Sequence, residues 1–354
     1  MDFFLAWIYS TIAEYTTNRV KITNMYNLIN ELENKVISIT GASGYIVSAL
    51  INELEGYSVN KIIRISRTKL IPKDNIEDWV LDLKEKSSWI KIVSQSDIII
   101  HLSGNTSISV AENNPENSLI SEVLPIINLI NASKELSYKP RVVFASTATI
   151  YGLTTELPVL ETHTSAPITF YDLHKFFAEQ QLKMASNNSL IDAISLRLAN
   201  VYGPSASESS AHDRGILTKV TKMSFENKNL QVYGKGDYIR DYIYIDDVVS
   251  AFMNASIIDY DKIRKKNEII FNVASGKGTS VKNVFSLISN EVEKITGTKL
   301  EVKNTPWPNG VNEIEKRNFI GSPERLKSLT GWSPNTTIEK GIFSLVCYYS
   351  KEYI

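Results

Sequence analysis

Cysteine is almost absent from this chain of 354 residues, which contains only Cys347. A single cysteine cannot form an internal disulfide and offers no metal-ligand spacing, so a reducing cytoplasm is the expected compartment and no metal site is expected. An excess of either charge is also missing, because 38 Lys and Arg residues stand against 39 Asp and Glu residues, a net charge of −1. A nearly neutral chain has no broad electrostatic attraction to nucleic acid or to an anionic membrane, so neither is expected as a partner.

A long hydrophobic run is missing as well. The apolar segment Phe3–Tyr9 follows Asp2 and is soon interrupted by Glu14. It is too short to span a bilayer, and it lacks the basic start and the small-residue cleavage pattern of a signal peptide. We expect residues 1–34 to form a helical extension whose apolar face packs on the body or on a sister subunit, in preference to anchoring at a membrane surface.

Short β-branched runs alternate with helical patterns along most of the remaining chain. Helical spacing occupies, among others, Tyr45–Leu54, Glu122–Leu136 and Asp172–Ala185. The apolar runs typical of buried strands are Lys35–Thr40, Lys61–Ser66, Asp97–Leu102, Arg141–Ser146 and Ala193–Leu198. This alternation predicts an α/β fold with a parallel sheet that is covered by helices on both faces.

The regular alternation ends after Asn200. Residues 201–215 are rich in Ser, Gly and Pro, and residues 276–354 mix helical and strand patterns around several prolines. These segments predict a smaller lobe beside the sheet. Ligands of open α/β sheets bind at the carboxyl ends of the strands, so we expect the lobe to close over that edge.

A glycine-rich turn containing Gly41 and Gly44 joins the first strand to the helix that begins at Tyr45. Glycines in such a turn let the backbone approach a pyrophosphate, which the free N–H groups at the helix start then bind. An ordinary turn between strand and helix is the alternative, and the usual third glycine is Val47 here. The position of the turn in the first strand–helix–strand unit favours phosphate binding.

The end of the second strand bears on which dinucleotide would bind. It carries Ser66 and Arg67 and lacks the acidic residue that would bind the ribose 2′-hydroxyl of NAD. An arginine suits the 2′-phosphate of NADP, so the sequence slightly favours NADP over NAD, with a solvated surface arginine as the alternative. Asp82 follows the next apolar run, where its carboxylate could reach the adenine or cap its own loop.

Tyr171 and Lys175 form a Tyr-x-x-x-Lys pair on a predicted helix. Four residues make about one helical turn, so both side chains lie on one face. A tyrosine with its ordinary pKa of about 10 is a poor base at neutral pH, and a nearby ammonium favours the phenolate. The pair alone is common by chance. Because Ser146 and Thr147 precede it at the end of a strand, a catalytic role is the favoured interpretation.

With these motifs in this order, residues 35–340 resemble the extended short-chain dehydrogenase/reductase family, in particular its nucleotide-sugar epimerases, dehydratases and reductases. Further matching segments are His101–Gly104, Ile150–Gly152, Arg197–Pro204, Val232–Gly236, Arg240–Asp241 and Phe271–Gly276. The resemblance implies a Rossmann-type doubly wound parallel sheet with a smaller C-terminal substrate-binding lobe. Residues 35–200 and 232–275 would form the NAD(P)-binding domain, and residues 201–231 and 276–354 would form the lobe.

The resemblance also implies roles for individual residues. Thr147 would hydrogen-bond the sugar oxygen, Tyr171 would move its proton, and Lys175 would hold the nicotinamide ribose. The expected cofactor-binding residues are Gly41, Ser43, Gly44, Tyr45, Ile46, Ser66, Arg67, Asp82, Leu83, Leu102, Ser103, Gly104, Tyr171 and Lys175. The expected substrate-binding residues are Thr147, Asn200, Arg240 and Arg317. Asn200 and Arg240 would contact a substrate diphosphate, and Arg317 lies where the family often places another arginine that faces the nucleotide.

The two residues after Thr147 limit the types of reaction that the site could catalyse. Dehydratases of this family typically carry an Asp-Glu pair there and decarboxylating relatives usually keep the Glu, whereas this chain has Ala148 and Thr149, which cannot transfer those protons. The resemblance then implies hydride transfer at a sugar carbon, with C4 as the expected position. We expect an NAD(P)-dependent nucleotide-sugar epimerase that acts through a keto intermediate, in surface-polysaccharide sugar synthesis. An NADPH-dependent 4-keto-6-deoxy nucleotide-sugar reductase is a close alternative.

The alternative of another class is a non-catalytic NADP-binding regulatory protein on the same fold. Such proteins typically lose the Tyr or the Lys, and this chain keeps both. A nucleotide-diphosphate sugar is the expected substrate. A homodimer is the expected assembly, because relatives commonly dimerise through a pair of helices.

Two further departures from the family pattern affect the expected site. Val47, in place of a glycine, would push its helix away from the strand unless a neighbour is small. Glu122 stands where relatives often have an asparagine near the active site. His174, next to Lys175, is expected to point outward.

Overall fold

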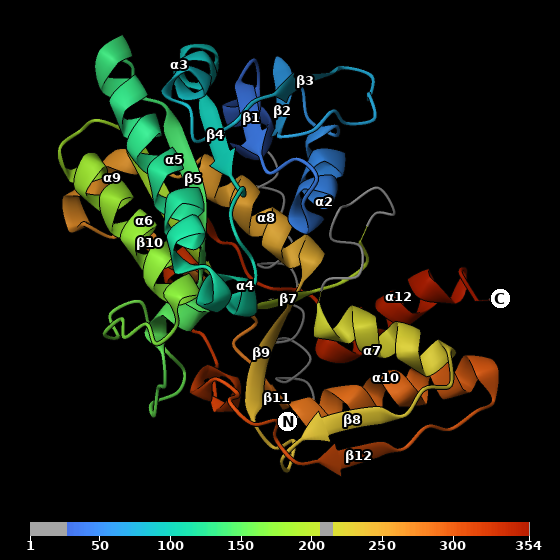
Figure 1. The fold of residues 1–354 in the computed structure, drawn as a ribbon. Helices are drawn as coiled ribbons and strands as arrows, with labels where there is room; N and C mark the ends of the chain where they lie inside the picture. The colour runs from blue at the N-terminus through green and yellow to red at the C-terminus, as the bar shows by residue number, and fades with distance from the viewer. Residues whose placement is uncertain (1–26, 206–214, 354) are drawn as a thin grey trace, which may run out of the picture.

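The computed structural model describes residues 27–205 and 215–353, and its centre is a seven-stranded sheet (Figure 1). Each strand runs parallel to its neighbours, in the order β10-β6-β5-β4-β1-β2-β3. The strands are β1 (Val36–Thr40), β2 (Lys61–Ser66), β3 (Ile76–Val80), β4 (Ile98–His101), β5 (Arg141–Thr147), β6 (Asp192–Leu198) and β10 (Ile270–Val273). The strand order runs outward in both directions from the β1–β4 pair, so the predicted doubly wound α/β fold is confirmed.

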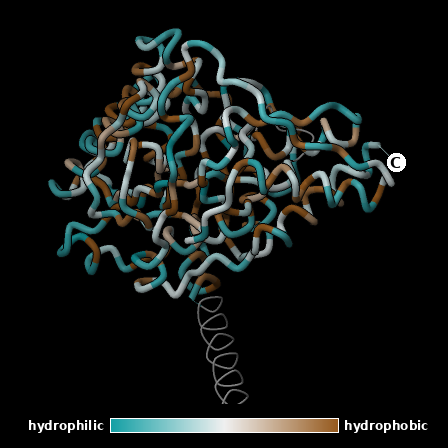
Figure 2. Tube along the Cα trace, turned by 90° about the horizontal axis from the view of Figure 1, so that it is seen from below, coloured by the Kyte–Doolittle hydropathy of each residue, from teal (hydrophilic) through white to brown (hydrophobic). Residues whose placement is uncertain are grey.

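Helices cover both faces of this sheet. Side chains alternate along a strand, so Ile98 and Ile100 of β4 enter one apolar core while Ile99 enters the other. The first core lies against α2 (Tyr45–Leu54), α8 (Ile245–Ser256) and α11 (Glu324–Thr330), and the second lies against α3 (Lys86–Gln95), α5 (Pro115–Leu136) and α6 (Phe170–Asn187). Figure 2 shows hydrophobic stretches running through the interior of this arrangement and hydrophilic loops around its outside.

The predicted helix Glu122–Leu136 is too short, because α5 begins at Pro115. The Asn114 side chain accepts a hydrogen bond from the Asn117 N–H at 3.0 Å and caps the helix. Proline is tolerated in the first turn, where its missing N–H has no partner to lose. The longer helix places Glu122 in its middle, facing α6 and buried.

Only the end of the predicted amino-terminal extension is described. Residues 27–32 are helical, and Leu28 and Leu32 are buried in the first core. Phe3–Tyr9 and the rest of residues 1–26 lie outside the described residues. Within residues 27–205 and 215–353, no helix combines the length and the apolar character needed to cross a membrane.

A second group of elements lies beside the sheet and has its own apolar core. Its strands are β7 (Asn200–Tyr202), β8 (Leu230–Tyr233), β9 (Ile239–Tyr244), β11 (Gly278–Ser280) and β12 (Val302–Thr305). Its main helices are α7 (Ile216–Phe225), α10 (Val281–Thr296) and α12 (Ile338–Ser350). The short elements α4 (Ile108–Asn113), η1 (Ala148–Tyr151), α9 (Tyr260–Lys266) and η2 (Glu313–Lys316) complete the described fold.

Candidate active site

The glycine-rich turn after β1 forms one wall of the site. Gly41 has a φ of +74°, and a Cβ there would lie 2.9 Å from the Ser103 backbone nitrogen, so glycine is required. Gly44 precedes the first turn of α2 and supplies no side chain to cap it, which leaves N–H groups at the helix start open to an anion. The Thr40 Oγ1, 2.7 Å from His101 Nδ1, ties the ends of β1 and β4 together beneath the turn.

A cavity of about 370 Å³ opens beside this turn at the carboxyl ends of the strands. Predicted cofactor-binding residues that line it are Gly41, Ser43, Gly44, Tyr45, Ile46, Ser66, Arg67, Leu83, Leu102, Ser103, Gly104, Tyr171 and Lys175. Asp82 does not line it, and its carboxylate accepts a hydrogen bond from the Lys84 N–H at 3.0 Å. Of the two roles open to Asp82, the structure therefore supports the cap of its own loop.

The substitution of Val47 for a glycine is accommodated inside the first core. Val47 is buried, and the same apolar cluster contains the small residues Ala42, Ala251 and Ala255. The helix α2 still begins at Tyr45, directly behind the glycine turn. The Tyr45 hydroxyl donates to the Gly203 carbonyl at 2.9 Å and connects this helix to the lobe.

Tyr171 and Lys175 lie on α6, whose start is capped by the Thr169 side chain. Both line the cavity, and the Lys175 ammonium donates to the Ala145 carbonyl of β5 at 3.2 Å. Burial raises the pKa of Tyr171 above its ordinary value, the nearby carboxylates of Glu122 and Asp172 raise it further, and a hydrogen bond with the Thr147 side chain lowers it. In this site the phenol is therefore the favoured form of Tyr171.

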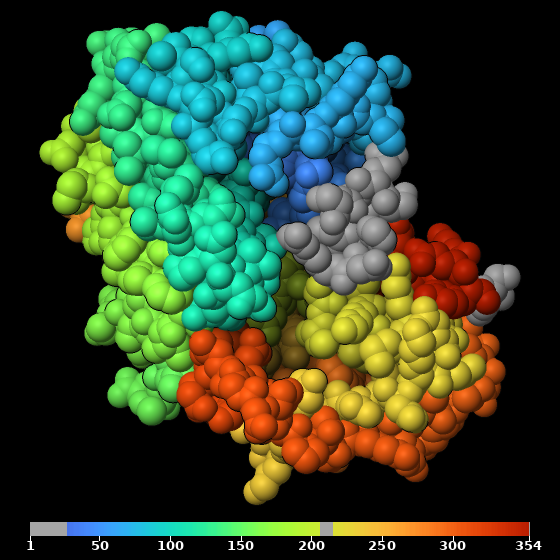
Figure 3. Space-filling model, viewed as in Figure 1, coloured from blue at the N-terminus to red at the C-terminus, as the bar shows by residue number. Residues whose placement is uncertain are grey.

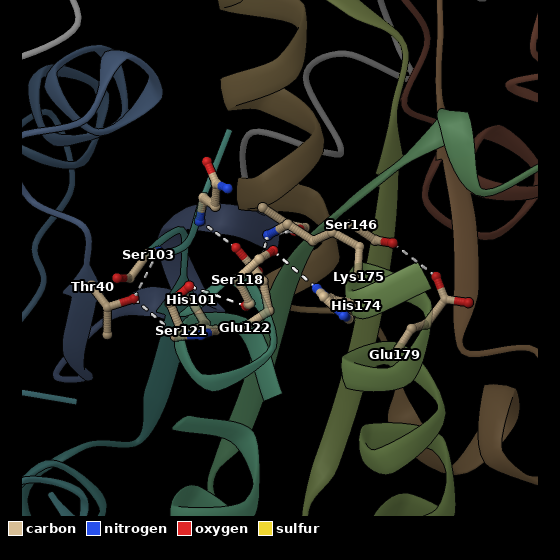
Figure 4. Close-up of polar contacts among 12 residues, drawn as sticks. Thr40, His101, Ser103, Ser118, Ser121, Glu122, Ser146, His174, Lys175 and Glu179 are labelled. Atoms are coloured by element: carbon tan, nitrogen blue, oxygen red, sulfur yellow. Dashed lines mark hydrogen bonds and ion pairs between the residues drawn. The ribbon is translucent and has the colours of Figure 1, made fainter. Parts of the chain in front are cut away.

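Glu122 was identified in the sequence only as a departure from the family pattern, and the structure places it directly behind the cavity wall, in contact with Lys175 and Gly104. Its carboxylate is 1% exposed, and Oε2 lies 2.9 Å from the Lys175 ammonium (Figure 4). Oε1 accepts a hydrogen bond from the Asn105 N–H. The expectation that His174 points outward is wrong, because α5 packs on that face of α6 and His174 Nδ1 lies 2.9 Å from Ser118 Oγ.

A chain of hydrogen bonds leads away from Thr147. Its Oγ1 lies 2.8 Å from Thr149 Oγ1, and the Thr149 hydroxyl donates to the Asp172 carboxylate. The Thr169 hydroxyl donates to the other oxygen of the same carboxylate at 2.7 Å. Tyr171 lines the cavity, whereas Asp172, the next residue, is fully buried behind it. Asp172 was not predicted, because no spacing rule indicates this burial.

A second cavity, of about 560 Å³, lies between α4, α7 and the three-stranded sheet. Three of the predicted substrate-binding residues line it, namely Asn200, Arg240 and Arg317, whereas Thr147 lines neither cavity. Thr106 lines both cavities, so they meet there. Figure 3 shows the surface hollowed between the teal segment that carries α4 and the yellow segment that carries α7.

The two arginines of the second cavity are held by backbone oxygens. Arg240 donates to the Glu315 carbonyl at 2.7 Å and Arg317 to the Ile314 carbonyl at 2.8 Å. Burial lowers the pKa of both, and the neighbouring Arg240 helps to bring that of Arg317 to about 10. Among the described residues, neither guanidinium forms an ion pair with a carboxylate.

Comparison with known proteins identifies the family. The model of the NAD dependent epimerase/dehydratase family matches residues 37–274. The UDP-glucose 4-epimerase of Mycoplasma genitalium is 27% identical over 269 residues, which cover 69% of this chain and 77% of that protein. The UDP-glucose 4-epimerase of Mycolicibacterium smegmatis is 23% identical over 325 residues, covering 88% and 97%.

Two solved structures have the same fold. The UDP-glucose 4-epimerase of Thermotoga maritima, solved with UDP-glucose, superimposes with a TM-score of 0.75 at 25% identity and covers 90% of this chain and 99% of its own. The UDP-N-acetylglucosamine 4-epimerase of Methanobrevibacter ruminantium M1 has a TM-score of 0.77 at 23% identity, with coverage of 90% and 99%. This chain belongs to the NAD-dependent epimerase/dehydratase family of enzymes.

Proposed function

We propose that this protein is a nucleotide-diphosphate sugar 4-epimerase that uses a bound nicotinamide dinucleotide. The observation that carries the proposal is the position of Tyr171, which lies with Lys175 on the wall of the first cavity, while the second cavity, which contains the guanidiniums of Arg240 and Arg317, meets the first at Thr106. The relatives named above are epimerases of UDP-sugars, which agrees with this arrangement.

The residues of the first cavity fit a dinucleotide. The close backbone approach at Gly41 and the open N–H groups of α2 suit a pyrophosphate. Leu81, Leu83 and Leu102 provide apolar walls. A bound nicotinamide would supply the group that exchanges a hydride with the sugar carbon, and Lys175 is the residue that would hold its ribose.

The second cavity fits the nucleotide diphosphate of the substrate. Arg240 is buried and Arg317 half-buried, neither forms an ion pair with a carboxylate among the described residues, and a diphosphate would supply negative charge with oxygens that guanidiniums bind in pairs. Tyr233 and Tyr238 lie against Trp307 with ring centroids 5.2 and 5.7 Å away and give the cavity an aromatic side.

Tyr171 is the residue that moves the proton of the sugar hydroxyl. Thr147 would accept a hydrogen bond from the same hydroxyl, because its own proton is donated to Thr149, whose hydroxyl donates to Asp172. Ala148 and Thr149 carry no carboxylate, so neither can remove a second proton from the sugar as dehydration requires. The keto sugar would instead be reduced again, with a hydride from the dinucleotide added to its opposite face and a proton from Tyr171 added to its oxygen, which gives the epimer.

The direct test is Tyr171→Phe, assayed with UDP-glucose and UDP-galactose in both directions. Loss of the acid–base group should lower turnover by about 10²-fold or more, because positioned general acids and bases contribute on that scale. Binding of the dinucleotide should remain, which a fluorescence titration checks. Turnover equal to that of the parent would refute the enzymatic role of Tyr171 and support a regulatory protein.

A 4-keto reductase that uses NADPH remains the second candidate, because Arg67 lies at the rim of the first cavity, next to Ser66. Among the described residues no ion pair engages the Arg67 guanidinium, so a 2′-phosphate would meet a free cation. Dinucleotide released by denaturing the purified protein separates the candidates. Near-stoichiometric NAD supports the epimerase, whereas an empty protein that binds NADPH much better than NADH supports the reductase.

The proposal also includes a homodimer and a cytoplasmic setting in which the product serves surface-polysaccharide synthesis. The homodimer is inferred from an exposed apolar stripe that runs along the neighbouring helices α5 and α6. On α6, Phe170, Phe177 and Met184 recur at intervals of two turns, and on α5 Leu119 and Ile127 are exposed as well. A second copy of the same helix pair would cover this stripe.

A further inference from the structure

The buried ion pair of Glu122 and Lys175 is the feature of the site that the proposed reaction leaves unexplained. Glu122 comes from the middle of α5, Lys175 from α6, and both side chains are almost completely excluded from solvent. Each charge is therefore compensated by the other, since an isolated buried charge is strongly unfavourable. Figure 4 shows the carboxylate of Glu122 between the backbone of the loop after β4 and the Lys175 ammonium.

The surrounding structure is built to accept this carboxylate. The Asn105 N–H donates to Oε1, and Gly104, with a φ of +153°, leaves the space that both oxygens occupy. A Cβ at Gly104 would lie 2.5 Å from Oε1 and 2.6 Å from Oε2. Glu122 is thus held in one place, with one oxygen fixed by the loop and the other facing the ammonium.

We propose that Glu122 is a positioning residue that holds the Lys175 ammonium in place and offsets its charge, so that Lys175 does not by itself favour the phenolate of Tyr171. This inference rests on the proposed function, because it assigns a consequence to the acid–base role of Tyr171. In a site with an unpaired lysine, the ammonium alone would favour the phenolate. Here that contribution is offset by a carboxylate 2.9 Å from the ammonium.

The other side chains that act on the pKa of Tyr171 carry no positive charge. From α6, Asp172 adds a second carboxylate that also raises the pKa of Tyr171, and from β5 Thr147 contributes only a hydroxyl. Lys175 lies one turn along α6 from Tyr171, and the charge of Arg317 acts on Asp172. Removing the charge of Glu122 should therefore lower the pKa of Tyr171, because one of the two nearby carboxylates is lost and the charge of Lys175 is no longer offset by its ion-pair partner.

The test is a pH titration of the Tyr171 phenolate in the protein without added dinucleotide. The chain has 17 tyrosines, so the near-ultraviolet phenolate absorbance is taken as the difference between each protein and its Tyr171→Phe counterpart. Glu122→Gln should lower the midpoint by about 1 pH unit or more, the scale of one neighbouring charge. The acidic limb of the pH–rate profile should move in the same direction.

Two variants and one control complete the experiment. Glu122→Asn removes the same charge and is measured if Glu122→Gln does not fold, and Glu122→Asp should restore part of the high midpoint. Glu112→Gln is the matched control, because this exposed carboxylate caps the Phe170 N–H of α6 and should leave the Tyr171 midpoint unchanged.

An unchanged midpoint in folded Glu122→Gln and Glu122→Asn would overturn the inference and leave Glu122 a purely structural residue. That outcome would not affect the proposed epimerase, whose failure is instead read from undiminished turnover in Tyr171→Phe.

Discussion

His101, a buried side chain at the end of β4, makes the stability of the folded protein depend on pH. It is 1% exposed, lies between Trp89 and Phe144, and shares a hydrogen bond with Thr40 beneath the glycine turn. Burial lowers the pKa of His101 to about 3, and the charge of Lys175 contributes to the decrease. The imidazole is therefore neutral in the folded protein throughout the physiological range.

This lowered pKa predicts a loss of stability in mild acid. The unfolded chain takes up the proton near pH 6.5 and the folded chain does not, so the stabilisation is present above that pH and falls as the pH drops toward 3. At pH 5 the free energy of unfolding should be about 2 kcal/mol lower on this account.

The measurement compares the parent with His101→Asn, which keeps a hydrogen-bonding group near Thr40 but does not titrate. Urea unfolding at pH 7 and pH 5 should show a larger decrease in the parent than in the variant. Equal decreases in both proteins would contradict the burial of a neutral imidazole.

At the scale of elements, the loop between β4 and α4 positions the α5–α6 pair. Its Gly104 packs directly on the carboxylate of Glu122, so any side chain there must displace that carboxylate. Gly104→Ala is expected to weaken dinucleotide binding and to lower the unfolding free energy, because the buried lysine loses its partner.

Gly297→Ala is the matched control for this substitution. Gly297 also has a positive φ, of +72°, but a Cβ there meets nothing within 4 Å. Gly297→Ala should lower the free energy of unfolding by about 1 kcal/mol through backbone strain and leave dinucleotide binding intact. Equal effects of the two alanines on dinucleotide affinity would show that the contact between Gly104 and Glu122 has no part in the site.

The elements were largely predictable from the sequence, and the contacts between them were not. Periodicity and β-branched runs indicated the strands β1, β2, β4, β5 and β6, because parallel buried strands are apolar on both faces. The start of α5 was missed, since two prolines obscure its pattern and one of them serves as the first residue of the helix. Helix boundaries depend on such local capping contacts.

The residues of the site also divide into those that a local sequence pattern predicts and those whose contacts depend on packing between elements. The glycine turn and the Tyr171–Lys175 pair follow local spacing rules, and the structure brings them together on the wall of one cavity. The ion pair of Glu122 with Lys175 joins residues from two helices, and the burial of Asp172 depends on the packing of α6. No spacing rule contains that information, although the departure from asparagine at Glu122 was the available signal.

At the scale of the whole molecule, the apolar stripe on α5 and α6 predicts self-association. Phe177 is 41% exposed in the middle of the stripe, so Phe177→Glu should convert the expected dimer to a monomer by placing two carboxylates in the interface. Sedimentation velocity measures the change.

Phe343→Glu is the control for the dimer, because Phe343 lies on α12, far from the stripe in sequence, and is 57% exposed. It should sediment like the parent. A parent that is already monomeric, or a Phe177→Glu protein that remains dimeric, would contradict dimerisation through this helix pair.

The central claim, that a hydride leaves and returns to the same sugar carbon within one closed site, is tested most directly with UDP-glucose carrying deuterium at C4. Mass spectrometry and NMR of the product should show the label retained at C4 of the epimer, with no net change in the reduced dinucleotide. Loss of the label, or consumption of one reduced dinucleotide for each product formed, would contradict the account.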